Sequence, residues 1–502
     1  MSNLFERLLA DKAGSDRPAL EAPGGLRLSF KELVQASGRM AGALAELGVK
    51  PGDRIAVQVE KSPANLVLYL ASLRAGAVYL PLNTAYTLSE VGYFVGDSEP
   101  SLIVCDPSAR AGMQALAQSS GARVECLDAA GQGGLAEIAA RQPADFNTVA
   151  RADDDLAAIV YTSGTTGRSK GAMLTHANLA SNASTLARVW RFTSGDVLIH
   201  ALPIYHVHGL FVAINVLLMA GGTMIFLPRF DPGEIVGLMP SATTLMGVPT
   251  FYTRLLRHAG LTPEAVSSMR LFVSGSAPLL AETHREWRAR TGHAILERYG
   301  MTETGMNVSN PYDGERVAGT VGLPLPGVEV RITDPETGAA IPRGRIGMIE
   351  VRGPNVFKGY WRMPEKTAQE FRADGFFITG DLGTVGQDGY VSIVGRGKDL
   401  IITGGLNVYP IEVEEKIDAL PGVVESAVVG LPHPDFGEAV TAVAATGGGA
   451  HPTEAQVLAA LEADLAAFKR PKRVIFVDEL PRNTMGKVQK AALRAQYLSL
   501  YG

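Results

Sequence analysis

A chain of 502 residues is longer than one hydrophobic core usually organises, so we expect at least two domains. Hydrophobic residues make up 46% of the sequence and charged residues 19%, which is typical of a folded globular protein. The net charge of −5 gives no reason to expect nucleic acid or an anionic membrane as a partner. The two cysteines, Cys105 and Cys126, have no metal-ligand spacing, and so few cysteines favour a reducing compartment and two buried side chains.

Two segments are candidates for a targeting or membrane-spanning sequence, and neither fits. Residues 1–16 mix apolar and charged side chains and predict a short amphipathic helix, not a signal peptide. Residues 209–227 are mostly apolar, but polar and glycine residues from Asn215 to Thr223 interrupt them, whereas a membrane-spanning helix needs about 20 continuous apolar residues. We therefore expect a buried helix, a glycine turn and a buried strand here, and a cytoplasmic protein.

Through most of the chain, helical periods alternate with short β-branched runs. We expect helices over residues 30–47 and 64–75 and strands over residues 54–59, 79–82 and 102–104. Strands that alternate with helices predict an α/β fold with layered, mostly parallel sheets flanked by helices.

The pattern changes after Asp381. Strands are expected at residues 391–394, 423–430 and 474–477, with an apolar run at 400–402 and helices over 410–420 and 454–466. The glycine-flanked polar run at residues 395–399 can absorb a change of φ and ψ. We predict a large N-terminal domain of residues 1–395 and a small, mobile α+β C-terminal domain of residues 396–502.

An apolar strand at residues 156–161 leads into a loop rich in glycine, hydroxyl side chains and cations. Glycines let backbone N–H groups approach a polyanion, while hydroxyls and Lys170 can donate to phosphate oxygens. A Walker loop needs a glycine, four residues and then Gly-Lys, but here Gly164 and Gly167 are too close together. We predict a phosphate-binding loop of another kind, since a flexible surface turn rarely combines so many hydroxyls and cations.

The run from Thr162 to Gly171 resembles the signature of the adenylate-forming superfamily, which comprises acyl-CoA synthetases, peptide-synthetase adenylation domains and firefly luciferase. Further signatures follow in the family's order, at residues 202–209, 274–279, 299–304, 379–381, 395–399 and 481–487. The resemblance implies a large N-terminal domain, a small C-terminal domain and an active site at their interface. It also implies ATP, Mg²⁺ and CoA as the small molecules that the chain uses.

The implied reaction joins a carboxylate to the α-phosphate of ATP, and these two anions repel each other. A Mg²⁺ ion held by a carboxylate and phosphate oxygens usually neutralises them. Glu303 resembles the family's Mg²⁺ ligand, although by itself it would suggest a helix start. Lys487 resembles the lysine that bridges the carboxylate and the α-phosphate, although a lysine near a C-terminus is normally solvated. Thr302 and His206 complete the predicted catalytic residues.

The resemblance also implies a nucleotide site. Asp381 can accept hydrogen bonds from both ribose hydroxyls, Arg396 resembles a second nucleotide contact, and Tyr299 resembles a residue that stacks on adenine. The other predicted ATP-binding residues are Thr162, Ser163, Gly164, Thr165, Thr166, Gly167, Lys170, Ser276, Ala277, Pro278, Glu297, Arg298, Gly300 and Met301.

Two half-reactions around one adenylate need two sets of groups, so a rotating small domain is expected. Lys398 matches the family's hinge position. Gly404 and Gly405 are expected to leave room for the pantetheine arm of CoA. The sequence shows no carrier domain after Lys487, which favours free CoA as the thiol.

The nature of the acid depends on Arg285. Taken alone, Arg285 would be a solvated arginine on a helix predicted over residues 280–290. That helix, however, begins directly after the loop that is expected to form the floor of the acid pocket. A dicarboxylic acid needs a cation for its second carboxylate, and arginine supplies a bidentate fork. The predicted acid-binding residues are Arg285, His206, His208, Ser276 and Met306. Residues 277–287 and 309–314 are similar to those of malonyl-CoA synthetases, which implies malonate, with methylmalonate as a second candidate.

Two alternatives stay open from the sequence. One is a synthetase for another short-chain or aryl carboxylic acid, and the other is a catalytically silent nucleotide-binding protein. Some relatives regulate the lysine that corresponds to Lys487 by acetylation. A lysine acetyltransferase and a deacetylase are therefore candidate partners, because loss of the charge would stop adenylation.

Overall fold

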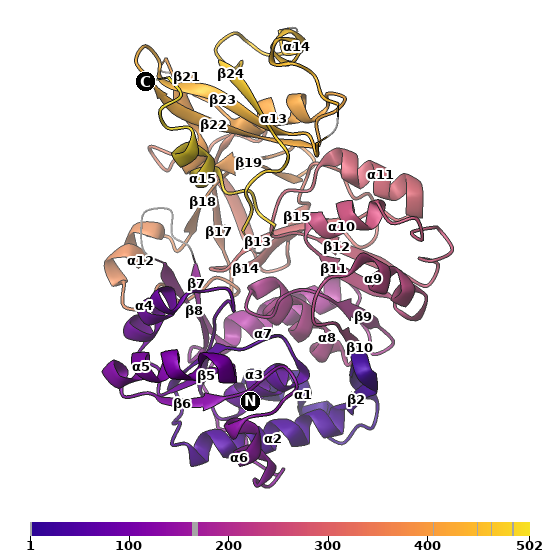
Figure 1. The fold of residues 1–502 in the computed structure, drawn as a ribbon, viewed down its shortest axis with the longest axis vertical. Helices are drawn as coiled ribbons and strands as arrows, with labels where there is room; N and C mark the ends of the chain where they lie inside the picture. Colours follow the sequence, from indigo (N-terminus) through magenta and orange to yellow (C-terminus); the bar gives the residue numbers. More distant parts are fainter. Residues whose placement is uncertain are drawn as a thin grey trace. The chain divides into compact units, whose positions relative to one another are not determined.

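The computed structural model describes residues 3–162, 169–404, 406–448, 450–462, 464–483 and 486–501. Its chain divides into two compact units, Met1–Glu329 with Arg352–Phe377, and Val330–Val351 with Ile378–Gly502 (Figure 1). The second unit therefore contains strands that precede residue 396. The sequence placed the domain boundary at residues 395/396 because a hinge is expected there. This boundary stays a prediction.

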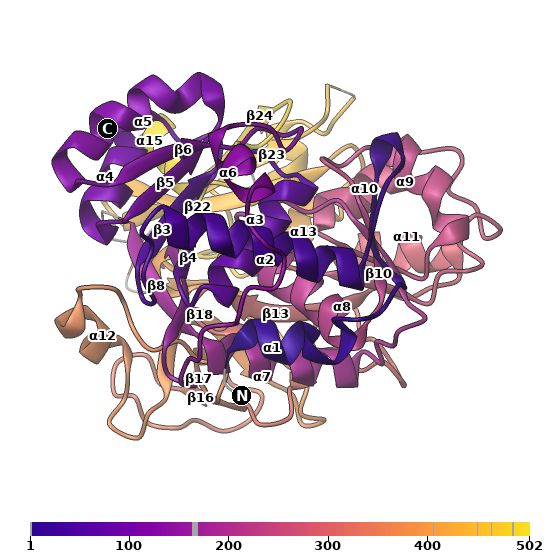
Figure 2. The same cartoon turned by 90° about the horizontal axis from the view of Figure 1, so that it is seen from below.

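The first unit contains a six-stranded sheet with the order β6-β5-β3-β4-β7-β8. All neighbours in it are parallel except β7 and β8. Its strands are β3 (Arg54–Gln58), β4 (Val78–Pro81), β5 (Leu102–Cys105), β6 (Arg123–Cys126), β7 (Leu156–Thr162) and β8 (Lys170–Thr175). Its helices are α2 (Phe30–Glu46), α3 (Pro63–Arg74), α4 (Leu88–Ser98), α5 (Arg110–Ser120) and α6 (Gly134–Ala140). Helix α2 packs beside α3 and α6 (Figure 2).

The same unit contains a nine-stranded sheet with the order β15-β14-β13-β12-β11-β9-β10-β1-β2. From β13 to β1 its neighbours are parallel. Its strands are β1 (Pro18–Ala22), β2 (Leu26–Ser29), β9 (Val197–His200), β10 (Thr223–Phe226), β11 (Thr244–Gly247), β12 (Leu271–Ser274), β13 (Leu296–Met301), β14 (Gly305–Ser309) and β15 (Leu323–Pro324).

Helices alternate in the sequence with the strands of the nine-stranded sheet. They are α1 (Leu4–Leu9), α7 (His176–Val189), α8 (Asn215–Ala220), α9 (Pro232–Leu238), α10 (Pro249–Leu256) and α11 (Ala281–Thr291), and α12 (Pro364–Glu370) follows later. Figure 1 shows α9, α10 and α11 next to one another, in agreement with their contacts. Strands β11 and β12 are buried along their whole length, as expected for parallel strands covered on both faces.

The apolar stretch at residues 209–227 folds as predicted. A π-helix, η4 (His208–Ile214), runs into α8, Gly221 turns the chain with φ of 77°, and β10 follows. Within the described parts of the chain, no helix combines the length and the apolar run needed to cross a membrane. The predicted burial of Cys105 and Cys126 is confirmed.

The second unit has the predicted α+β character. A four-stranded sheet contains β16 (Glu329–Thr333), β17 (Gly347–Arg352), β18 (Phe377–Val385) and β19 (Val391–Arg396). A five-stranded sheet contains β20 (Ile401–Thr403), β21 (Leu406–Val408), β22 (Glu425–His433), β23 (Gly437–Ala445) and β24 (Arg473–Val477). Helices α13 (Pro410–Asp418) and α14 (Glu454–Ala460) pack on its apolar core, and α15 (Lys490–Gln496) follows. Helix α14 ends at Ala460, earlier than the sequence predicts.

Candidate active site

The carboxyl ends of β9, β12 and β13 lie at one edge of the nine-stranded sheet, because these strands belong to its parallel part. Strand β9 leads to residues 201–207, β12 leads to residues 275–278, and β13 carries Arg298 and Tyr299. Ligands of open α/β sheets bind at this edge. Three of the predicted motifs are thus brought together although they are far apart in the sequence.

Three polar side chains meet at this edge, and we call Ser276, His208 and Arg298 the Arg298 cluster. The Ser276 hydroxyl oxygen lies 3.2 Å from His208 Nδ1. The Arg298 guanidinium fills the space beside Gly275, where an added Cβ would lie 2.3 Å from its Nη1 atom. Ser276 has φ of 74°, a strained conformation for a residue other than glycine, and such strain is concentrated at functional sites.

The donors of the Arg298 cluster are incompletely paired. Among the residues that the structure describes, none forms a hydrogen bond with Arg298 Nε, Arg298 Nη2 or His208 Nε2. Burial lowers the pKa of Arg298 to about 9, and burial together with the Arg298 charge lowers the pKa of His208 well below its usual value. A buried charge without a partner is costly, so the cluster fits an anionic ligand.

A second polar group lies at the turn between β13 and β14, and we call Lys170, Glu303, Tyr360 and Glu370 the Tyr360 network. The Tyr360 hydroxyl lies 3.1 Å from Glu303 Oε1 and 2.6 Å from Glu370 Oε2. Lys170 Nζ, at the start of β8, donates to Glu370 Oε1 at 2.9 Å and lies 4.1 Å from the centre of the Tyr360 ring. Lys366 also pairs with Glu370 at 2.9 Å.

The protonation states in the Tyr360 network follow from these contacts. Burial and then the Glu303 charge raise the pKa of Tyr360, so it carries its phenol proton at neutral pH. Burial would raise the pKa of Glu370, but hydrogen bonds from Tyr360, Lys170 and Lys366 outweigh it and lower that pKa. Glu370 is therefore an ionised acceptor between two cations.

The sequence did not reveal Tyr360 or Glu370 as site residues. Tyr360 contacts a carboxylate that lies 57 residues earlier in the chain, and no spacing rule connects the two. Its neighbours Gly359 and Trp361 make it look like part of an ordinary aromatic core. The pairing of residue 360 with Ala172 of β8 and the hydrogen bond from Phe357 N–H to Glu303 O bring it to the site.

A further pair supports the segment after β9. Lys61 Nζ lies 2.9 Å from His200 Nδ1 and donates to His200 O at 2.8 Å. Because lysine has only donors when charged and His200 Nδ1 faces it, the His200 proton belongs on Nε2, which lies 2.9 Å from Gly209 O. Burial, followed by the Lys61 charge, keeps the pKa of His200 well below its usual value. A neutral His200 thus ties the strand end to the start of η4, near His206 and His208.

The other predicted residues of the first unit lie as follows. Thr162 pairs with Lys170 across β7 and β8, and the predicted loop residues Ser163, Gly164, Thr165, Thr166 and Gly167 lie outside the described residues. Burial lowers the pKa of the half-buried His206 to about 4. Burial raises the pKa of Glu297 to about 8. Ala277, Tyr299, Gly300, Met301 and Thr302 are half-buried, and Pro278 is exposed.

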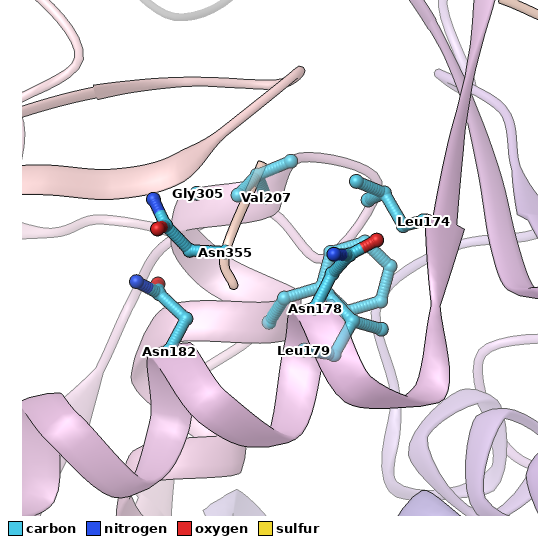
Figure 3. Close-up of a pocket in the computed structure, with 8 residues that line it drawn as sticks. Leu174, Asn178, Leu179, Asn182, Val207, Gly305 and Asn355 are labelled. Atoms are coloured by element: carbon cyan, nitrogen blue, oxygen red, sulfur yellow. The ribbon is translucent and has the colours of Figure 1, made fainter. Parts of the chain in front are cut away.

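A small pocket adjoins Gly305, at the start of β14 (Figure 3). Asn182 exchanges two hydrogen bonds with the backbone of Met306, at 2.9 and 3.0 Å, and Asn355 Nδ2 donates to Thr304 O at 2.7 Å. The pocket is lined by Leu174, Asn178, Leu179, Asn182, Val207, Phe211, Gly305 and Asn355. Asn182 and Asn355 thus fix the backbone that follows Glu303, where Met306 is buried.

Arg285 lies apart from this arrangement. It belongs to α11, its side chain is 65% exposed, and it pairs with Glu282 one turn away at 2.8 Å. The buried arginine that lies beside Gly275 and whose charge acts on His208 is Arg298, which the sequence assigned to ATP. The predicted role of Arg285 in acid binding stays a prediction.

In the second unit, Asp381 and Arg396 face each other across β18 and β19. Arg396 Nε lies 2.7 Å from Asp381 Oδ1, and this pair joins two residues that the sequence assigned separately to the nucleotide. Lys487 has an exposed side chain, and its backbone N–H donates to Asn483 Oδ1 at 3.0 Å. The charges that act most strongly on the Lys487 ammonium are those of Arg396 and Asp381.

The predicted hinge and CoA residues also belong to the second unit. Lys398 lies in the short helix η6 (Gly397–Asp399), directly after β19. Gly404 has φ of 56°, and its N–H donates to Phe436 O at 2.8 Å. Gly405 lies outside the described residues.

Two family models match the chain, "AMP-binding enzyme" over residues 8–361 and "AMP-binding enzyme C-terminal domain" over residues 412–487. The first match covers well over half of the chain, and the chain belongs to the AMP-binding enzyme family. The superfamily resemblance and the α/β fold class predicted from the sequence are confirmed.

Individual members of this family are similar to the chain over nearly its whole length. The chain is 64% identical to the crystal structure of ATP-bound MatB from Rhodopseudomonas palustris, with a TM-score of 0.99 and full coverage of both chains. It is 35% identical over 542 residues to a malonate–CoA ligase of Arabidopsis thaliana, which covers 98% of this chain and 88% of the relative. It is also 37% identical over 479 residues to a feruloyl-CoA synthase of an Amycolatopsis species, covering 94% and 95%.

Proposed function

We propose that this chain is an acid–thiol ligase that uses ATP to convert malonate into malonyl-AMP and pyrophosphate. In the second half-reaction it transfers the malonyl group to CoA, which gives malonyl-CoA and AMP. Membership of the AMP-binding enzyme family and the likeness to a malonate–CoA ligase support this proposal. Methylmalonate is a second candidate substrate.

The observation that carries the choice of acid is the Arg298 cluster. A monocarboxylate has one anionic group, and adenylation consumes it. A dicarboxylate keeps a second charge that needs a cation with donors in a fork, and Arg298 offers two unpaired guanidinium nitrogens beside Ser276 and His208. We therefore propose Arg298 as the partner of the second malonate carboxylate. Arg285, which the sequence predicts for this role, is the alternative.

The proposed chemistry moves charge in two steps. A malonate carboxylate oxygen attacks the α-phosphorus of ATP, and the bond from that phosphorus to the β-phosphate bridging oxygen breaks. Lys487 balances the charge that develops at this phosphorus, and Lys170 neutralises the phosphates. The CoA sulfur, after loss of its proton, then attacks the acyl carbonyl carbon, and AMP leaves with the adenylate oxygen.

Glu303 fits the Mg²⁺ ion that the family implies. Its carboxylate is 6% exposed and is oriented by Tyr360. The described residues hold no group of three or more His, Cys, Asp or Glu side chains that could cage a metal ion. This agrees with Mg²⁺, which is commonly held by one or two carboxylates plus substrate phosphates. When bound, Mg²⁺ would neutralise phosphate charge as pyrophosphate leaves.

The proposal includes three further assignments. Asp381 and Arg396 contact the nucleotide, Lys398 is the hinge between the two half-reactions, and Gly404 lies along the pantetheine arm. Acetylation of Lys487 would remove the charge needed for adenylation. A mass spectrum of the native protein with only unmodified Lys487 would contradict that regulation. A cytoplasmic location belongs to the same proposal.

The second candidate function is activation of another short-chain or aryl carboxylic acid. The 37% sequence identity to a feruloyl-CoA synthase supports this alternative. Pyrophosphate release should be measured with malonate, methylmalonate, acetate and ferulate, each with and without CoA. We expect the highest kcat/KM for malonate and sustained turnover only with CoA. A preference for ferulate would favour the aryl-acid alternative, and no release with any acid would contradict the ligase proposal.

A further inference from the structure

The Tyr360 hydroxyl lies between two carboxylates that come from separate segments of the first unit. It is 3.1 Å from Oε1 of Glu303, in the turn after β13, and 2.6 Å from Oε2 of Glu370, at the end of α12. A phenol carries one proton, so the two carboxylates share its hydrogen bond, and the contact with Glu370 is the shorter of the two. The Tyr360 oxygen therefore lies closer to Glu370 and also faces Glu303.

Several contacts hold Tyr360 in this position. Its side chain is 2% exposed, and its ring packs edge-on against Phe357 with a centroid separation of 4.9 Å. Its backbone N–H donates to Thr367 Oγ1 at 2.9 Å, which ties it to α12. It also pairs with Ala172 of β8. The hydroxyl thus has little freedom to follow Glu303, and Glu303 must adapt to the hydroxyl.

The backbone around Glu303 is fixed from the same side. Phe357 N–H donates to Glu303 O at 2.7 Å, and Asn355 Nδ2 donates to Thr304 O at 2.7 Å. Residues 355–360 therefore hold both the backbone and the carboxylate of the turn. A carboxylate has about four acceptor positions, so a hydrogen bond from the Tyr360 hydroxyl is compatible with binding of a cation.

The network continues to the end of the predicted phosphate loop. Glu370 Oε1 accepts from Lys170 Nζ at 2.9 Å, and Lys170 belongs to the predicted phosphate-binding loop. Lys366 supplies a second cation to the same oxygen at 2.9 Å. The acid that anchors Tyr360 is thus itself anchored by the predicted phosphate-binding lysine.

We infer that Tyr360 and Glu370 are positioning residues that orient the Glu303 carboxylate for a divalent cation and couple it to Lys170. This inference rests on the metal-binding role proposed for Glu303. Neither residue touches the reacting atoms. Their effect is on how well the divalent cation binds when nucleotide is present, because partners that orient a ligating carboxylate commonly change metal affinity.

The test measures metal binding without turnover. The full chain is saturated with α,β-methylene-ATP, in which the bond that adenylation breaks is blocked, and Mn²⁺ binding is followed by the loss of the free-ion EPR signal. We expect Tyr360→Phe to weaken Mn²⁺ binding by about tenfold and Glu370→Gln by a smaller factor, because glutamine can still accept from Tyr360. The Mg²⁺ concentration for half-maximal pyrophosphate release should rise by the same factors.

Tyr69→Phe is the matched control, because it removes another buried hydroxyl that has a side-chain acceptor, Asn215 Oδ1, at 3.1 Å. It should lower the unfolding temperature but leave Mn²⁺ binding unchanged. Unchanged Mn²⁺ binding in Tyr360→Phe would overturn the inference, as would an equal loss in the control. If Tyr360→Phe does not fold, Glu370→Gln decides by the same criterion.

Failure of the proposed function has a different signature. Glu303→Gln should abolish Mn²⁺ binding, and unchanged binding in that variant would contradict the metal role of Glu303 itself. Absence of pyrophosphate release from the unaltered chain would contradict the ligase proposal. If Glu303→Gln loses Mn²⁺ binding but Tyr360→Phe retains it, the inference about Tyr360 is contradicted while the proposed metal role of Glu303 stands.

Discussion

The Arg298 cluster and the Tyr360 network adjoin the same hairpin, β13 and β14, and differ in how their polar atoms are paired. In the Arg298 cluster, buried nitrogens of Arg298 and His208 have no hydrogen-bond partner among the residues described. In the Tyr360 network, Glu370 lies against a phenol and two lysines.

This difference distinguishes a cluster that an anionic ligand would complete from a network in which carboxylates, a phenol and lysines pair with one another. A folded protein keeps an unpaired buried cation at a cost in stability, and such a cost is expected where an anionic ligand completes the site. A network whose charges pair with one another stabilises one geometry, in which Tyr360 and Glu370 hold Glu303 and Lys170 in place. Mutations in the two groups should therefore move activity and stability in different ways.

Arg298→Met is expected to have the largest effect. The change keeps side-chain volume and removes the cation, so kcat/KM for malonate should fall by about a thousandfold, or about 4 kcal/mol. The free energy of unfolding in urea should stay the same or rise, because an unpaired buried charge disappears. Activity is measured by pyrophosphate release with malonate and with acetate. An equal loss with both acids, or a marked loss of stability, would contradict the comparison.

Lys170→Met is the corresponding change in the Tyr360 network. It removes one of the two cations beside Glu370, whose side chain is 20% exposed, so the free energy of unfolding should fall by about 1 kcal/mol. The apparent KM for ATP should rise, because the lysine is the predicted phosphate contact. Urea unfolding without ligands and initial rates at varied ATP measure the two effects. A variant as stable as the original chain would show that the network is not held by this ion pair.

Arg285→Ala is expected to have the smallest effect. Its partner Glu282 is 76% exposed, and exposed pairs contribute at most about 1 kcal/mol. With Arg298 as the partner of the second carboxylate, malonate activity should remain close to that of the original chain. The variant serves as the arginine control for Arg298→Met in the same assay. Collapse of malonate activity with monocarboxylates spared would instead support Arg285, as the sequence predicts.

Elements with a strong local pattern were predictable. The periods of α2 and α3 and the β-branched run of β5 appear in the sequence because apolar spacing and turn residues act within a few positions. The buried helix, turn and strand after His208 were predictable for the same reason. Two errors concern the C-terminal part of the chain. Helix α14 ends earlier than predicted, and strand β23 was not predicted at all.

The sequence by itself determined the family, because its motifs are short local runs of residues whose chemistry is legible without the fold. Which polar groups meet was decided only by the tertiary structure. Arg285 and Arg298 are both plausible cations in the sequence, but α11 exposes the first while β13 buries the second beside Ser276 and His208. Tyr360 reaches Glu303 because its segment pairs with β8 and bonds to the Glu303 backbone through Phe357. Burial and partnership depend on contacts between distant segments, and these set the cost of each charge.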